Sequence, residues 1–215
     1  MYPYPLLQKN IIVFPLFGEQ TQWDPCIFDY SNEDFLNVDP RNIDNMNSYN
    51  REHLKNSRKT WWLGWYLENR SHILKGTHIQ KQGRIYHLGI DIMPTEALSI
   101  FNPLNWEVYE RGYEAWDGNY GWYIIIRYTL WWTIFYALYG HLSYESLNTQ
   151  SIIPQGESIG KLGNTSENGN WFLHLHLQIF TGEDIDIWKN RGYCWAEDVP
   201  NMKYICPDPN FLVRY

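Results

Sequence analysis

The chain has 215 residues, of which 44% are hydrophobic and 19% charged, so it can bury a sizeable core and lacks the composition of a disordered protein. Its 12 tryptophans and 17 tyrosines favour β-strands and aromatic-lined grooves. A formal net charge of -7 argues against a nucleic-acid-binding protein, because neutralising phosphates requires a cationic surface.

Residues 1–80 differ in composition from the rest and are predicted to form an N-terminal extension that packs on the core. The asparagine-rich stretch 31–59 predicts irregular structure with one short helix near residues 50–59. Aromatic patches at 14–17 and 61–66 indicate contact with the main body. The sequence as given shows no secretory signal, which predicts a cytoplasmic protein, with export by a route not visible in the sequence as the alternative.

Residues 81–215 are predicted to form one domain built on an antiparallel β-sheet. Short apolar runs separated by Gly, Pro and Asn indicate closely spaced strands in an all-β arrangement. The predicted strands are 85–92, 106–113, 120–128, 133–140, 158–162 and 172–180. The apolar run 121–142 contains Arg127 and many β-branched residues, so it predicts two strands joined by a turn rather than a membrane span.

The three cysteines are Cys26, Cys194 and Cys206, and no two of them have the CxxC spacing. An odd number in a chain without a visible signal favours free thiols. Pairing of Cys194 with Cys206 stays open for an exported protein.

The first histidine motif is HLGID, residues 87–91. In an extended strand His87 and Asp91 project from the same face, so an imidazole and a carboxylate would stand side by side. Gly89 between them leaves space for a bulky group. Taken alone the motif is weak, because most such patterns are a polar strand face.

The second motif is LHLHL, residues 173–177. Strict alternation sends the three leucines into the core and places His174 and His176 together on the opposite face. Two protonated imidazoles at that spacing would repel each other, so a bound cation or a buried neutral site explains them economically. A half-exposed strand with a polar face is the alternative.

A third motif, YGHL, closes the long apolar run and carries His141 at a strand end beside a glycine. That position suits a cleft-lining side chain, although a hydrogen-bonded loop histidine is the simpler interpretation. Together the three motifs supply two histidines and one carboxylate for a metal and leave two histidines over. This is the inventory of a catalytic zinc site, with three protein ligands and an open fourth position.

These motifs, in this order, resemble the signatures of the M23 (LytM/lysostaphin-type) zinc metallopeptidases. The segment GESIGKLGNT at 156–165 is similar to a further signature of the family, and the resemblance spans about residues 84–181. It implies an antiparallel β core with a groove and one Zn2+ per chain. It also implies that His87, Asp91 and His176 hold the zinc, and that His141 and His174 form the catalytic pair.

A narrower likeness extends beyond the metal motifs. The segments WWLGWYLENR, TIFYALYGHLS, IGKLGNTSENGNW and ICPDPNFL are similar to an M23-type domain found fused between a kinase-like domain and a class III aminotransferase. The chain departs from the family at 93–99, at Asn105-Trp106 and at Leu173. None of these departures touches a predicted ligand, but they alter the groove walls, so substrate preference is not carried over.

The resemblance implies a zinc-dependent hydrolase that cleaves a peptide amide bond, in a peptidoglycan-type or a small peptide substrate. Either His141 or His174 is the general base, and the sequence does not distinguish them. The alternative function is a cytosolic metal-binding module that regulates or scaffolds a metabolic partner such as an aminotransferase or kinase. A protein partner is thus possible in either case, and neither a nucleic acid nor a membrane span is expected.

Overall fold

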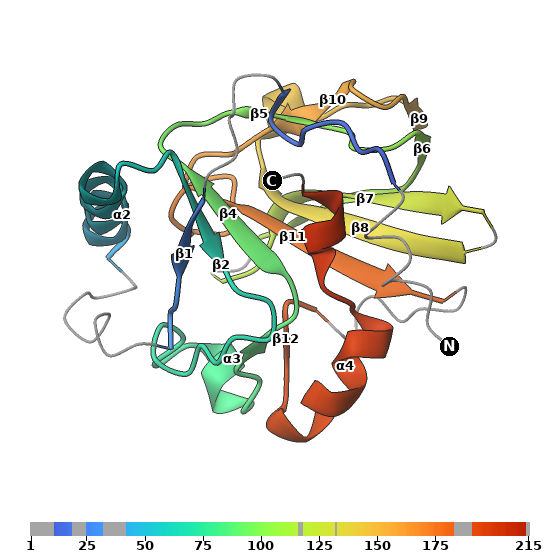
Figure 1. Cartoon of the computed structure of the whole chain (residues 1–215). Coiled ribbons are helices and arrows are strands. Elements are labelled where there is room, and N and C mark those ends of the chain that lie inside the picture. Colours follow the sequence, from blue (N-terminus) through green and yellow to red (C-terminus); the bar gives the residue numbers. More distant parts are fainter. Residues whose placement is uncertain are drawn as a thin grey trace.

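The computed structural model describes residues 11–18, 25–31, 42–115, 118–131, 133–182 and 191–213. It confirms a mainly β fold with an antiparallel sheet core and some helix (Figure 1). Every neighbouring pair in the main sheet is antiparallel except β1 and β2, which are parallel. The eight strands, in order across the sheet, are β1 (Pro25–Phe28), β2 (Trp61–Gly64), β4 (Ile90–Pro94), β11 (Leu175–Thr181), β8 (Thr133–Leu142), β7 (Gly121–Leu130), β6 (Trp106–Glu114) and β9 (Ile152–Ile153).

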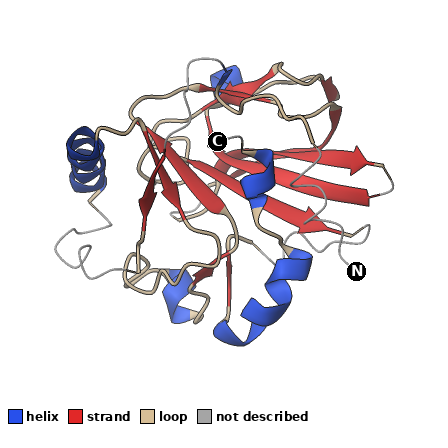
Figure 2. Cartoon of the chain, viewed as in Figure 1, coloured by secondary structure: helices blue, strands red, loops and turns tan. Residues whose placement is uncertain are grey.

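Two small two-stranded sheets and short helices surround the main sheet (Figure 2). Strand β5 (Ser99–Phe101) pairs with β10 (Ser158–Lys161), and β3 (Tyr86–His87) pairs with β12 (Tyr193–Cys194). The helices are α2 (Ile43–Ser57), α3 (His78–Lys81) and α4 (Val199–Ile205), with 3-10 turns η3 (Tyr144–Ser146), η4 (Ala196–Asp198) and η5 (Pro209–Leu212).

Alternation along the central strand β11 separates the core from a polar face. Leu175, Leu177 and Ile179 point into the largest hydrophobic cluster, which the 3-10 turn η5 helps to close. His176 and Gln178 occupy the intervening positions and therefore face the opposite side of the sheet. On that side two smaller clusters, one beneath α2 and one beneath α4, flank the polar positions. The sheet thus holds a buried polar strip between two apolar patches.

The predicted pair of strands across residues 121–142 is confirmed as β7 and β8. The single strand predicted at 85–92 is wrong. It is divided at Leu88-Gly89 into β3 and β4, which belong to different sheets. The predicted helix at 50–59 is α2, which begins earlier because the Asn42 side chain accepts a hydrogen bond from the Asn45 N–H and caps it. Among the described residues no helix is long and apolar enough to cross a membrane.

The N-terminal segment extends the sheet itself. Strand β2 pairs along its whole length with β4, and β1 pairs with β2, so this segment supplies two of the eight strands (Figure 1). Trp62 is fully buried beneath α2, where the centroid of its ring lies 4.0 Å from that of the Phe28 ring and 4.9 Å from that of the His53 ring.

All three cysteines, which lie in described segments, are free thiols. Cys194 and Cys206 are buried in the cluster beneath α4, whereas Cys26 is partly exposed on β1. Burial raises the pKa of both Cys194 and Cys206 to about 12.

The role of the N-terminal strands can be measured with two tryptophans of the same segment. Trp62→Ala leaves a large cavity among packed aromatic rings and should lower the free energy of unfolding by about 3–5 kcal/mol. Trp65, which is 42% exposed, is the matched control. Trp65→Ala should change the free energy of unfolding by about 0.5 kcal/mol. Urea denaturation measures both, and equal losses would show that β2 contributes little to the core.

Candidate metal centre and its flanking histidines

Three predicted ligand residues meet on the polar face of the sheet. His87 ends β3, Asp91 lies on β4, and His176 lies directly opposite Asp91 on β11. His176 Nδ1 is 3.0 Å from His87 Nε2 and 3.0 Å from Asp91 Oδ1, and the last two atoms are 3.4 Å apart. All three residues are buried. Two imidazole nitrogens and one carboxylate oxygen therefore converge on one point.

This donor set fits a zinc ion. Zinc takes imidazole nitrogen and carboxylate oxygen at about 2.0–2.2 Å in a tetrahedron, which separates its ligand atoms by roughly 3.3–3.6 Å. The separations of 3.0–3.4 Å observed here need only small adjustments of the rings. Three protein ligands leave one tetrahedral position open, as in catalytic rather than structural zinc sites.

A bend at Gly89 brings the ligands together, rather than the shared strand face predicted from the sequence. The space beside Gly89 is filled by the His176 ring. A Cβ at residue 89 would lie 2.7 Å from His176 Cε1 and 2.6 Å from the Leu177 carbonyl oxygen. A side chain at this position would therefore displace a ligand histidine.

Hydrogen bonds at the far nitrogens fix the two ligand histidines. Gln178 Oε1 accepts from the Gly192 N–H at 3.1 Å, which identifies it as the amide oxygen and makes His176 Nε2, 3.3 Å away, the donor. His87 Nδ1 lies 3.4 Å from the Trp65 carbonyl oxygen and donates to it. The proton on each far nitrogen leaves the inward nitrogen with a free lone pair, as a metal ligand requires.

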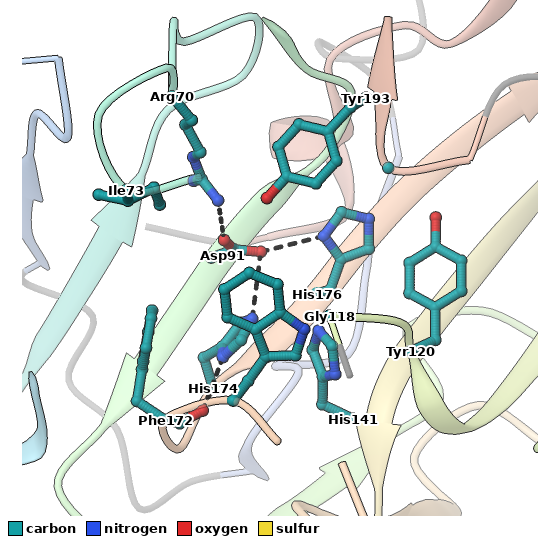
Figure 3. A pocket seen from close by; sticks show the side chains of 12 residues that line it. Arg70, Ile73, Asp91, Gly118, Tyr120, His141, Phe172, His174, His176 and Tyr193 are labelled. Atoms are coloured by element: carbon teal, nitrogen blue, oxygen red, sulfur yellow. Dashed lines mark hydrogen bonds and ion pairs between the residues drawn. The ribbon is translucent and has the colours of Figure 1, made fainter. Parts of the chain in front are cut away.

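His141 and His174 stand beside Asp91 and His176 (Figure 3). Each Nδ1–H donates to a backbone carbonyl, of Asn168 at 2.7 Å and of Phe172 at 2.8 Å. Their ring centroids are 4.3 Å apart, and both rings line the cavity next to the ligands. His174 Nε2 lies 3.7 Å from Asp91 Oδ1. Two neutral imidazoles thus flank the candidate metal ligands.

The backbone of His141 is held in the left-handed region, with φ of 65°. A residue other than glycine is uncommon there, and such positions cluster at functional sites. The His141 N–H donates to the Tyr120 carbonyl and its own carbonyl accepts from the Gly163 N–H, so hydrogen bonds on both sides hold this backbone conformation.

Arg70 holds the other oxygen of Asp91. Its Nη1 donates to Asp91 Oδ2, and its Nε donates to Glu68 Oε2 at 2.9 Å. Both Arg70 and Glu68 are buried. The sequence linked neither residue to Asp91, because no motif joins them.

Burial and charge determine the protonation of the site. Burial, followed by the charge of Arg70, lowers the pKa of His87 to about 3. Burial likewise lowers the pKa of His174, and burial together with the neighbouring histidines lowers that of His141. Burial acts to raise the pKa of Asp91, but Arg70 and His87 hold it well below its usual value. The centre therefore combines the neutral imidazoles of His87, His141 and His174 with an ionised carboxylate at neutral pH.

The space beside the ligands is small but adjoins a larger cavity. The cavity lined by His141, His174 and His176 has about 20 Å³, roughly the room for one water-sized molecule. A second cavity of about 230 Å³ includes His78, Arg84 and Arg191 in its lining. The two cavities share four lining residues: Gly118, Tyr120, Gly192 and Tyr193.

The structure brings all five sequence-predicted site residues together, His87, Asp91, His141, His174 and His176. Sequence reasoning missed Glu68, Arg70, Gln178 and the carbonyl acceptors that orient the rings. Of these, Gln178 carries a detectable signal, because it follows His176 on the same face of a strand and is polar there.

Comparisons with known proteins agree with the site chemistry. Residues 85–187 match the family model described as Peptidase family M23. No curated protein matches the chain.

Solved structures with partial similarity include two lysostaphin structures and a zinc-containing peptidase. The catalytic domain of the antimicrobial peptidase lysostaphin from Staphylococcus simulans is 20% identical, with 55% of this chain and 80% of that chain covered and a TM-score of 0.38. A solution structure of lysostaphin is 17% identical, covering 66% and 50%, with a TM-score of 0.42. A zinc-containing peptidase from Vibrio cholerae is 17% identical, with a TM-score of 0.37, and 45% of this chain covers only 28% of that protein.

The lowered histidine pKa values predict how stability depends on pH. Below about pH 6.5 the unfolded chain binds protons that folded His87, His141 and His174 do not, so stability is lost as the pH falls. Each neutral histidine contributes about 1.4 kcal/mol per pH unit. Burial raises the pKa of Glu68 to about 7, so folded Glu68 takes up a proton as the pH falls and offsets the loss of stability from one histidine.

We therefore expect the urea midpoint of the metal-free protein to fall steadily from pH 6.5 to pH 5. His141→Asn, which removes one titrating ring, should make this fall shallower. A midpoint that stays level or rises on acidification would contradict neutral, buried imidazoles.

Proposed function

We propose that the protein is a zinc-dependent hydrolase that cleaves an amide bond in a peptide, because residues 85–187 match the M23 peptidase family model. The observation that carries the proposal is the pair His141 and His174, two neutral imidazoles beside a three-residue metal group. Metal retention alone does not require these two residues, whereas hydrolysis requires groups that move protons at the metal. This favours an enzyme over a regulatory metal-binding module.

In this proposal His87, Asp91 and His176 hold the zinc, which supplies an acidified water and polarises the scissile carbonyl. The other steps belong to the chain. His141 and His174 keep their Nδ1 protons on backbone carbonyls, so Nε2 of each is the nitrogen that exchanges protons. Because burial lowers the pKa of both, each is unprotonated at neutral pH and able to accept a proton. One serves as general base and takes a proton from the water on Nε2. A ring that has gained this proton can then stabilise the oxyanion or protonate the leaving amine.

The substrate is proposed to be a peptide, of either peptidoglycan or a small soluble chain. The 20 Å³ beside the ligands admits little more than the reacting atoms. The cavity of about 230 Å³ shares four lining residues with the site and offers room for flanking parts of a peptide. A panel of purified peptidoglycan and synthetic peptides distinguishes the two substrate classes.

Two histidine substitutions separate metal binding from catalysis. His141→Ala should lower kcat by about 10²–10⁴-fold, because it removes a proton-transfer group, while about one zinc per chain remains bound. His176→Ala should lose most of the zinc together with activity, because it removes a ligand. Elemental analysis and a peptide-cleavage assay on the same preparations measure both quantities.

His53→Ala provides the control for loss of an imidazole, because His53 lies on the exposed part of α2, away from the cavity. It should keep both zinc and turnover. Full activity in His141→Ala would contradict its catalytic role. Undiminished zinc in His176→Ala would contradict the ligand assignment.

A further inference from the structure

Arg70 reaches the metal centre from outside residues 85–187, the segment that matches the peptidase family. It is 2% exposed, and its guanidinium spans two carboxylates, with Nη1 on Asp91 Oδ2 and Nε on Glu68 Oε2. Figure 3 shows its side chain pointing to the Asp91 oxygen that faces away from the histidines. The opposite oxygen, Oδ1, is the one that lies 3.0 Å from His176 Nδ1.

Three contacts hold Arg70 and its partner Glu68 in place. Glu68 Oε1 accepts a hydrogen bond of 2.6 Å from the Tyr30 N–H, which ties the carboxylate to the backbone after β1. The Tyr30 ring lies under the guanidinium, with Arg70 Cζ 4.8 Å from its centroid. The Arg70 N–H donates to the Ile85 carbonyl at 2.8 Å, which fixes the base of the side chain.

The facing strand leaves room for this arrangement. Gly64 on β2 pairs with Asp91 on β4, and a Cβ at Gly64 would lie 2.7 Å from Arg70 Nη2. Glycine is thus the residue that lets a guanidinium lie beside Asp91 on a neighbouring strand. Strand β2 and the Glu68–Arg70 pair thus surround one oxygen of the Asp91 carboxylate.

We infer that Arg70 is a positioning residue for the metal centre, which occupies Asp91 Oδ2 so that Oδ1 alone is presented to the metal between His87 and His176. The inference rests on the proposed zinc site. A planar fork that binds both Glu68 and Asp91 fixes the rotation of the carboxylate, whereas a single ammonium supplies charge without fixing that rotation. The N-terminal segment thereby acts on the metal through Asp91.

Arg70→Lys and Arg70→Met separate geometry from charge. Both should weaken zinc binding by about 10–100-fold, the usual effect of losing a group that orients a metal ligand. Arg111→Lys is the matched control. Arg111 lies on β6, away from the site, and it also donates through Nε and an Nη, but to the backbone carbonyls of Asn148 and Gln150. Its zinc affinity should stay within about twofold of the wild type.

Zinc affinity is measured by competition with a chromophoric chelator, after circular dichroism has shown that each variant is folded. The proteins are then saturated with Co2+, whose visible absorption depends on ligand number and geometry. Release of the second carboxylate oxygen should shift this band in both Arg70 variants and not in Arg111→Lys. Neither readout depends on catalytic activity.

Each outcome decides the inference. Weaker zinc binding with a shifted Co2+ band in both Arg70 variants supports it. Wild-type affinity or an unchanged band in Arg70→Lys would overturn it, because charge alone would then suffice. A wild-type chain that binds no zinc would overturn the proposed metal site itself, and this inference with it.

Discussion

Asp91 brings a negative charge into an eight-stranded sheet, where it is 1% exposed and largely cut off from bulk water. An isolated ion at such a depth costs far more than a protein's net stability, so its surroundings must compensate the charge. Arg70 does so, and its own burial then requires Glu68, whose carboxylate is anchored by the Tyr30 N–H. These contacts connect Asp91, through Arg70 and Glu68, to Tyr30 next to strand β1. Removing one of these residues would leave the next charge without its partner. The contacts are therefore coupled rather than independent.

The histidines meet the same constraint in a different way, since neutrality avoids the cost of burying a charge. Every ring has one nitrogen turned outward to a fixed acceptor: a backbone carbonyl for His87, His141 and His174, and the Gln178 amide oxygen for His176. Carbonyls that belong to the backbone move little. Ring orientation is therefore set before any ligand arrives, which lowers the reorganisation needed on binding.

Local pattern explains which parts of this arrangement the sequence predicts. Alternation over residues 173–177 is a property of neighbours, and it correctly separated core leucines from site histidines. The break at Leu88-Gly89 was missed, because an apolar residue and a glycine fit an unbroken strand as well as a bend. Strands β1 and β2 were missed for a different reason. They are four residues each, and the pairings of β1 with β2 and of β2 with β4 join residues that lie 27 to 36 positions apart in the sequence. Arg70 has no motif, since only that long-range pairing brings it to Asp91.

The two cysteines buried beneath α4 can report local opening of this part of the structure. A thiol with a pKa near 12 is ionised to roughly one part in 10⁵ at pH 7, so Cys194 and Cys206 are nearly inert to alkylating reagents while folded. Their labelling rate then reports how often the region beneath α4 separates from the sheet. Cys26, partly exposed on β1, supplies an accessible thiol in the same molecule for reference.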